Sequence, residues 1–202
     1  INTMTQDQKI KAVQSKLNLV ADGDAGPKTW AAIYSRIVGS STITPSASIP
    51  ERLVELAKKE VGVREHPRNT NRGKRVQEFQ NATWLDGTGW AWCAAFICWL
   101  CREAGVKDSV RPKTAGAWDF ERWARKASSP VNLYKPASKT KIQAGDILVF
   151  SQSHIGLASH SQGVKSVSTI EGNTDASGSR EGGGVYARSR RLSEVRSVIR
   201  FK

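Results

Sequence analysis

The hydrophobic period of this 202-residue chain changes near residue 142, and that change limits the folds open to it. Before this point, apolar residues recur every three or four positions, which predicts helices at 50–63, 72–84 and 93–105. After it, short alternating runs are separated by Gly, Ser, Asn and Asp turns, which predicts strands at 145–151, 154–160, 164–172, 184–190 and 196–201. Helices followed by strands indicate an α+β unit with an antiparallel sheet of about five strands.

A second, smaller unit precedes this one. Residues 7–38 show the helical period on both sides of a Gly- and Pro-containing turn, which predicts two short helices. Residues 41–50 are rich in Ser, Thr and Pro and carry no charge, as expected of a linker. We therefore expect an N-terminal module at 1–40, a linker at 41–50 and a larger domain at 51–202.

The net charge of +13 lies mostly in the larger domain. Residues 1–48 carry five Lys or Arg and three Asp or Glu, a net +2, which leaves +11 for residues 49–202. Such a field attracts polyanions, whether nucleic acid, anionic lipid or phosphate-bearing envelope polymers. No apolar run reaches the roughly 18 residues of a transmembrane helix. The first residues lack the basic and apolar regions of a secretory signal, so we expect synthesis without a signal peptide.

All three cysteines, Cys93, Cys98 and Cys101, lie within one predicted helix. Cys98 and Cys101 form a C-x-x-C pair, which is compatible with zinc, a redox dithiol or apolar packing. A zinc site needs four ligands, and no second pair with suitable spacing is present. A redox pair belongs at a helix N-terminus, whereas these two lie in mid-helix. Apolar packing is therefore favoured for both, and we expect no metal.

Cys93 differs because it follows a Gly-interrupted loop and so lies in the first turn of its helix. Unpaired N–H groups and the positive end of the helix dipole lower a thiol pKa at that position. A thiolate nucleophile also needs an imidazole to exchange protons with it. His154 begins an apolar strand and suits this role, whereas His66 and His160 lie in polar surroundings.

The imidazole in turn needs a group that fixes its tautomer. Glu171 and Asn173 end the next predicted strand, and residues two apart on a strand point the same way. Either could orient His154. Aromatic residues also precede the cysteine, and their faces suit sugar rings and peptide methylenes, although core packing is an equally good explanation. Trp90 and Trp92 are the predicted substrate contacts.

The motifs GWAWCAAFICWLCREAG, AGDILVFSQSHIGLAS and IEGNT resemble the CHAP domain, a papain-like family of bacterial and phage cell-wall hydrolases. The resemblance covers roughly residues 50–202. It implies helices packed on the antiparallel sheet, with Cys93 as nucleophile, His154 as general base and acid, and Glu171 and Asn173 as orienting groups. Some family members carry an Asp-rich calcium loop before a Gln-Cys pair. Here Trp92 stands in place of that Gln, so neither calcium nor another cofactor is expected.

The first 40 residues resemble a small all-α peptidoglycan-binding module of the three-helix type, through the turn DGDAGPKT. The residues of that turn predicted to bind cell wall are Asp22, Gly23, Gly26, Pro27 and Thr29. Together the two halves resemble a modular phage or prophage endolysin. The resemblance implies a monomer that binds peptidoglycan and hydrolyses one of its amide bonds, either as an N-acetylmuramoyl-L-alanine amidase or as an endopeptidase of the stem or cross-bridge. It would act in the periplasm or cell wall after release from the host cytoplasm.

Three other functions fit parts of the sequence. The basic charge fits a nucleic-acid-binding protein, but no zinc finger, RNP-type aromatic pair or basic helix is present, so we expect no nucleic-acid partner. A wall-binding protein with a decayed catalytic set would require that its retained Cys, His, Glu and Asn are accidental. A toxin injected into competitor cells would keep the same chemistry. For a cell-wall hydrolase, the basic surface serves to attract anionic envelope polymers.

Overall fold

The computed structural model describes residues 4–17, 19–26, 29–30, 32–33 and 47–202. The chain divides into two compact units, Ile1–Ser46 and Ala47–Lys202. In the first unit, helix α1 spans Gln6–Lys16 and begins at a capping box. The Thr5 hydroxyl accepts from the Gln8 N–H, and the Gln8 side chain accepts from the Thr5 N–H, which satisfies two otherwise unpaired donors.

The larger unit begins with helices, as the sequence predicts. Helix α3 starts two residues inside the expected linker, because Ser48 and Glu51 form a second capping box at its N-terminus. The short helix α6 follows a loop and was not predicted. The helices of this unit are α3 (Ile49–Glu60), α4 (Lys74–Gln80), α5 (Cys93–Glu103) and α6 (Asp119–Ala124).

One six-stranded antiparallel sheet follows, with strand order β1-β6-β2-β3-β4-β5. Five strands match the predicted runs. The sixth, β1, is four residues long and pairs with β6 about 70 residues later, so its own sequence gives little signal. The strands are β1 (Val131–Tyr134), β2 (Ile147–Phe150), β3 (Ile155–Ala158), β4 (Ser166–Thr174), β5 (Gly184–Arg191) and β6 (Val195–Phe201), with 3-10 turns η1 (Ala137–Lys139) and η2 (Leu192–Glu194).

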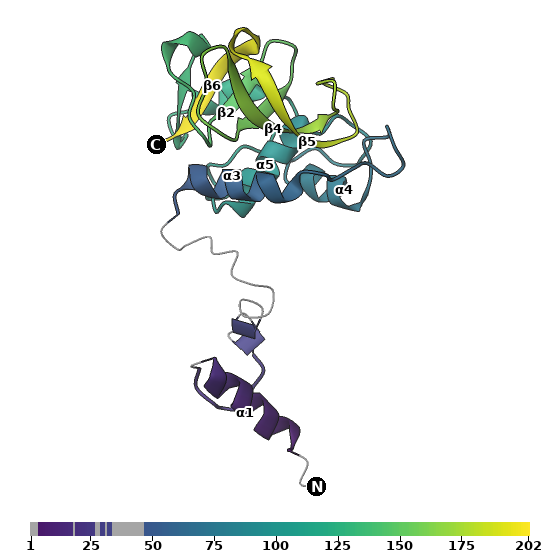
Figure 1. The fold of residues 1–202 in the computed structure, drawn as a ribbon, viewed down its shortest axis with the longest axis vertical. Helices are drawn as coiled ribbons and strands as arrows, with labels where there is room; N and C mark the ends of the chain where they lie inside the picture. The colour runs from purple at the N-terminus through teal and green to yellow at the C-terminus, as the bar shows by residue number, and fades with distance from the viewer. Residues whose placement is uncertain (1–3, 18, 27–28, 31, 34–46) are drawn as a thin grey trace. The chain divides into compact units, whose positions relative to one another are not determined.

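Helix α5 lies at the centre of the larger unit. It contacts β3 and β4 on one side and α3 and α4 on the other, and these helices lie together beside the sheet (Figure 1). Every residue of α5 from Cys93 to Cys101 is buried, as its apolar sequence predicts. The α+β class and the packing of helices on an antiparallel sheet are therefore confirmed.

Both faces of the sheet are covered. Along β2, Ile147 and Val149 belong to the large core shared with the helices, whereas Leu148 and Phe150 belong to a smaller core. This alternation follows from the two-residue period of a strand and explains why the whole run ILVF is apolar. Within the part of the chain that the structure describes, no helix has the length and apolar character needed to cross a bilayer.

Candidate active site

Cys93 is the first residue of α5, as the sequence predicts. Trp92 is the N-cap residue, and its backbone N–H donates to the Asn173 side-chain oxygen at 2.8 Å. Only 6% of Cys93 is exposed, and its side chain is among the neighbours of the His154 imidazole. A buried helix therefore presents the thiol at its N-terminus, where N–H groups of the first turn have no acceptor within the helix.

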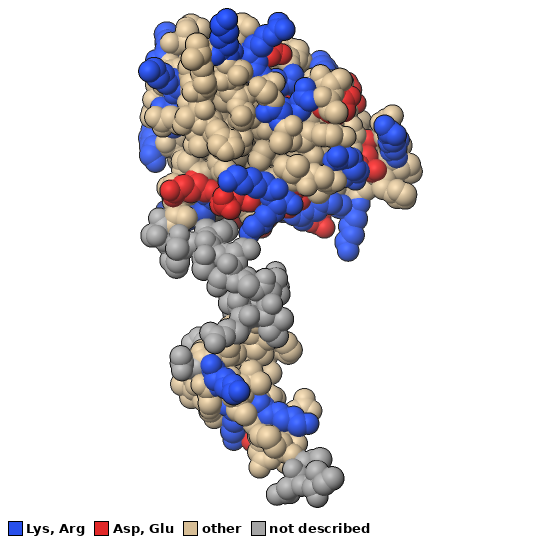
Figure 2. Space-filling view, in the orientation of Figure 1, with Lys and Arg blue, Asp and Glu red and all other residues tan. Residues whose placement is uncertain are grey.

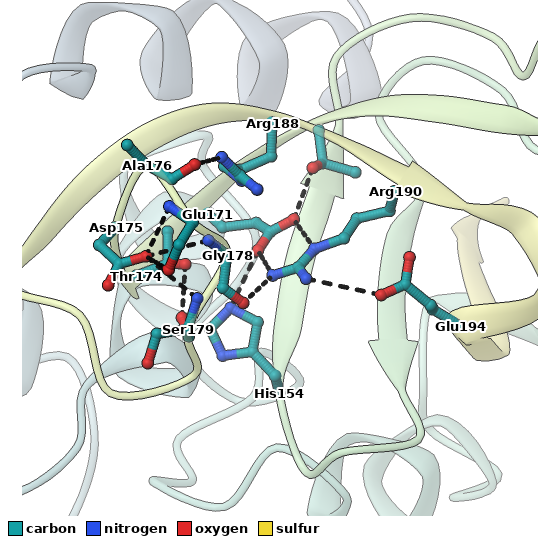
Figure 3. A network of polar contacts seen from close by, with 12 residues as sticks. His154, Glu171, Thr174, Asp175, Ala176, Gly178, Ser179, Arg188, Arg190 and Glu194 are labelled. Atoms are coloured by element: carbon teal, nitrogen blue, oxygen red, sulfur yellow. Dashed lines mark hydrogen bonds and ion pairs between the residues drawn. The ribbon is translucent and has the colours of Figure 1, made fainter.

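His154 lies directly before β3 and is fully buried. Its Nε2 lies 3.1 Å from Glu171 Oε2 (Figure 3). Its ring stacks on Phe150, with the ring centroids 5.9 Å apart. The other ring nitrogen, Nδ1, has no hydrogen-bond partner among the described residues. Nδ1 is therefore the nitrogen left to exchange a proton with a reacting group.

Cys93 is one of the neighbours that raise the pKa of this imidazole, although no hydrogen bond joins the two side chains in this structure. Burial lowers the pKa of His154, but the neighbouring side chains of Cys93 and Glu171 outweigh it and raise that pKa to about 9. Catalytic hydrogen bonds are often long before substrate binds. The imidazole thus keeps its proton at neutral pH beside the thiol.

Glu171 is the group that contacts His154, and it is fully buried on β4. Its Oε1 accepts from the Thr169 hydroxyl at 2.6 Å and from Arg190 Nε at 2.9 Å, while Oε2 accepts from Arg190 Nη2 at 2.6 Å. Burial raises the pKa of Glu171, but Arg190 and His154 together lower it to about 2. The carboxylate is therefore ionised and fully hydrogen-bonded.

Asn173 does not reach the imidazole. The register of β4 against β5 shifts between Glu171 and Thr174, and Asn173 has a φ of +57°, so the expected alternation breaks at this point. Its side chain instead accepts from the Trp92 N–H and donates to Asn71 Oδ1 and the Gly182 carbonyl. Asn173 thus joins the end of β4 to the start of α5, and Glu171 alone holds the ring.

The glycine between these two residues sets how closely α5 approaches β4. A Cβ on Gly172 would lie 2.7 Å from the Trp92 ring and 2.8 Å from the Cβ of Phe96. Only a residue without a side chain fits there without a shift of α5. The short sequence EGN therefore supplies the group that contacts His154, the close packing of α5 and the hydrogen bond to the N-cap residue Trp92.

The prediction that Trp92 contacts substrate is wrong. Trp92 is fully buried, its ring stacks on Phe79 at 5.6 Å, and its Nε1 donates to Glu65 Oε1 at 2.9 Å. Its alternative interpretation as a core residue holds. Trp90 is partly exposed and donates to the Gly87 carbonyl at 3.2 Å, so its predicted role in substrate binding stays a prediction.

The other two cysteines pack in the core. Cys98 and Cys101 are fully buried, and burial raises the pKa of Cys98 to about 12 and that of Cys101 well above its ordinary value. All three cysteines are free. Among the described residues, no group of three or more His, Cys, Asp or Glu side chains is arranged to hold a metal ion.

The predicted wall-binding turn of the N-terminal unit is built around a buried glutamine. Gln14 Nε2 donates to Asp22 Oδ1 at 2.6 Å and to Thr29 Oγ1 at 3.0 Å, and Gln14 Oε1 accepts from the Gly23 N–H. A Cβ on Gly23, whose φ is +84°, would lie 2.0 Å from an Asp7 oxygen. These contacts give the turn a structural role, while its role in binding stays a prediction.

Gly26 and Pro27 are the other two residues of that turn that are predicted to bind cell wall. Gly26 accepts a backbone hydrogen bond from the Trp30 N–H at 3.1 Å. Pro27 lies outside the described residues.

Arg190 and Thr169 were missed by the sequence analysis. Arg190 is one of two adjacent arginines on β5, and nothing in the run GVYARSRR distinguishes a buried arginine from an exposed one. Thr169 lies two residues before Glu171 on the same strand, so its place on the same face could have been deduced from the strand period.

Residues 85–173 match the family model of the CHAP domain. The matched region contains Cys93, His154 and Glu171, which the fold brings together, and ends at Asn173. A comparison with curated proteins gave no match to the chain. The family match and the α+β fold together support a CHAP-domain protein.

Proposed function

We propose that this chain is a cysteine-dependent peptidoglycan hydrolase that cleaves an amide bond. A CHAP domain implies peptidoglycan amidase or peptidase activity in general. The observation that carries the proposal is the position of Cys93 at the start of α5, beside a buried imidazole that Glu171 holds at 3.1 Å. A thiolate, an imidazole and a group that orients the imidazole are the parts that nucleophilic acyl transfer requires.

The first half of the reaction forms an acyl-enzyme. The Cys93 thiolate attacks the amide carbonyl carbon, and the C–S bond forms as the carbonyl oxygen takes negative charge. His154 Nδ1–H then gives its proton to the leaving nitrogen, and the C–N bond breaks. The raised pKa of His154, about 9, keeps that proton available at neutral pH. A thioester on Cys93 and a free amine result.

The second half is hydrolysis of the thioester. His154 Nδ1, now neutral, takes a proton from water as the water oxygen attacks the thioester carbonyl. The C–S bond breaks, the carboxylic acid leaves, and the thiolate–imidazolium pair is restored. Glu171 contacts Nε2, at 3.1 Å in this structure, and so leaves Nδ1 to exchange protons in both steps.

Backbone N–H groups are the donors proposed for the oxyanion. The Trp92 side chain is unable to serve, because its Nε1 already donates to buried Glu65. The N–H groups of the first turn of α5 are free of helical acceptors and carry the positive end of the helix dipole. They suit an oxygen that becomes negative during attack by Cys93.

The basic charge suits a substrate that carries anions. Residues 49–202 hold a net +11, and Lys and Arg are spread over the face of the larger unit shown in Figure 2. Phosphate-bearing envelope polymers would raise the local concentration of such a protein at the wall. With the N-terminal turn as a wall-binding element, we place the activity in bacterial lysis of the endolysin kind, in the periplasm or cell wall.

Digestion of purified sacculi tests the proposal and identifies the bond. We expect the full chain to release soluble fragments whose masses, read by mass spectrometry, show one new amine and one new carboxylate. A new muramic acid carboxylate with a free L-Ala terminus indicates an amidase, and a split inside the stem or cross-bridge indicates an endopeptidase. Fragments with new reducing sugars, or no release by the folded protein, contradict the proposal.

The pH dependence of hydrolysis follows from the pKa of His154. Because the imidazolium must donate a proton, kcat/KM should stay near its neutral value to about pH 8. It should then fall toward tenfold per pH unit above the pKa of about 9. A rate profile from pH 6 to 10.5 checks this expectation.

Unfolding at high pH has to be separated from this effect. The His154 pKa is raised from 6.5 to about 9, so its contribution to stability is complete below pH 6.5 and is lost as the pH rises through 9. Circular dichroism at each pH therefore accompanies the rates. A rate that stays constant to pH 10.5 in folded protein rules out the acid role given to His154.

A further inference from the structure

Arg190 forms a two-pronged ion pair with Glu171. It lies on β5, with 5% of the residue exposed, and the strand beside it carries Glu171. Its Nε donates to Oε1 at 2.9 Å and its Nη2 to Oε2 at 2.6 Å. Such paired contacts fix the plane of a carboxylate as well as its place.

Besides Glu171, the Gly178 carbonyl and the Glu194 carboxylate lie beside the guanidinium (Figure 3). Its Nη2 donates to the Gly178 carbonyl at 3.2 Å, and its Nη1 lies 3.7 Å from Glu194 Oε1. Its centre lies 5.2 Å from the centroid of the Phe150 ring, which also stacks on His154. One aromatic ring therefore packs against both the arginine and the imidazole.

These contacts leave Glu171 little freedom. Oε2 receives both His154 and Arg190, whereas Oε1 receives Thr169 and Arg190. Without the arginine, one hydroxyl and one imidazole remain, and the carboxylate is free to turn about its last bond. Any such turn moves Oε2 away from Nε2 and changes the direction of Nδ1.

We propose that Arg190 is a positioning residue for the active site: it fixes the Glu171 carboxylate and offsets its charge, and so sets the orientation and basicity of His154. The proposal rests on the proposed function for its effect on catalysis, but its effect on the imidazole is independent of any substrate. Arg190 lies beyond the matched region 85–173, so the family match assigns it nothing.

The sign of the effect on His154 follows from the charges around it. The ionisable groups that face the imidazole and its partner are Cys93 on α5, Glu171 on β4 and Arg190 on β5, with Glu194 and Asp175 acting on Arg190. Without Arg190, Glu171 still accepts from Thr169 and His154 and stays ionised. Its charge is then no longer offset, so the imidazolium is favoured and the pKa of His154 rises.

An NMR titration of the histidine side chains tests this directly in the full chain. The parent is Cys93→Ser, which removes the thiol from the coupled titration, and His154→Gln identifies the resonance among the three histidines. We expect Arg190→Gln to raise the pKa of His154 by roughly one unit. Arg190→Lys keeps the charge and should leave the pKa within about 0.3 unit of the parent.

Arg188 offers a matched control on the same strand. It donates to the Ala176 carbonyl in the same loop that Arg190 contacts, but it does not touch Glu171. Arg188→Gln removes the same charge and should leave the pKa of His154 within about 0.3 unit of the parent. An unchanged or lowered pKa in folded Arg190→Gln, or an equal rise in Arg188→Gln, overturns the proposal.

Kinetics in the Cys93 protein separate positioning from charge. We expect Arg190→Lys to lower kcat about 10- to 100-fold with little change in KM, because lysine keeps the charge but is unable to form the two-pronged contact with Glu171. If circular dichroism shows that Arg190→Gln does not fold, Arg190→Lys is the deciding variant. An unchanged kcat in folded Arg190→Lys overturns the proposal. If the parent chain itself releases nothing from sacculi, the proposed function fails, while the titration still tests Arg190.

Discussion

Replacement of Cys93 by alanine should lower the rate of peptidoglycan hydrolysis by at least about 10⁴-fold, because the nucleophile is lost and only binding and backbone donors remain. Cys93 starts α5 and is 6% exposed, so the change removes a sulfur at the edge of the core. The fold should survive with the far-UV circular dichroism of the parent. Release of soluble fragments from sacculi, followed over time, measures the loss.

Cys98→Ala is the matched control, because it removes the same atoms from the same helix. Cys98 is fully buried, and its Sγ lies 3.4 Å from the Thr114 carbonyl. The cavity should cost about 1–2 kcal/mol of stability and leave the rate near that of the parent. A fully active Cys93→Ala chain, or loss of turnover in folded Cys98→Ala, removes the chemical basis of the proposed function.

Glu171→Gln should affect both stability and turnover. The substitution leaves the Arg190 guanidinium buried without its main partner, which costs about 3–5 kcal/mol. It also replaces the carboxylate that holds the His154 ring by a neutral amide with one acceptor oxygen instead of two, so the ring is held less well and turnover should fall about 10²- to 10⁴-fold. Urea denaturation at pH 7 measures the first effect, and fragment release measures the second.

The stability effect of Glu171→Gln has a defined pH range. The pKa of Glu171 is lowered from 4.5 to about 2, so the stabilisation is complete above pH 4.5 and is lost as the pH falls through 2. The gap in unfolding free energy between parent and variant should therefore persist at pH 7 and close toward pH 2. A gap that is equal at both pH values contradicts the assigned ion pair.

Glu194→Gln serves as the comparison variant. Glu194 also pairs with Arg190, at 3.7 Å, but its side chain is 35% exposed. Partly exposed pairs contribute about 0–1 kcal/mol, so this variant should keep nearly full stability and turnover. Equal losses in both glutamate variants would mean that bulk charge near Arg190, rather than contact with His154, controls the site.

Local patterns in the sequence were sufficient to predict much of the site. The Gly-rich loop before Cys93 predicts a helix start there, and the apolar run after His154 predicts a strand start, as the structure has them. The strand period predicts that Glu171 and Asn173 share one face, but it leaves open which of them orients His154. The direction of Asn173 was predicted wrongly, because a shift in strand register and a positive φ override that period.

Features set by distant contacts escaped the sequence analysis. Trp92 looks like a loop aromatic available to substrate, and only its stacking on Phe79 and its bond to Glu65 reveal that it is buried. Arg190 looks like one of many basic residues in a chain of net charge +13. Strand β1 is stabilised mainly by a partner far along the chain. In each case tertiary contacts, rather than a local sequence pattern, decide the burial or the strand pairing.

The side chain of Asn173 has a mechanical consequence. By bonding to the Trp92 N–H at 2.8 Å, it ties the helix that carries sulfur to the strand that carries the carboxylate. Fraying of the N-terminus of α5 would have to break this hydrogen bond as well as the packing of Trp92. The start of α5 and the end of β4 should therefore open together, as one cooperative unit. Local opening that moves Cys93 away from the strand that carries Glu171 should therefore require this hydrogen bond to break.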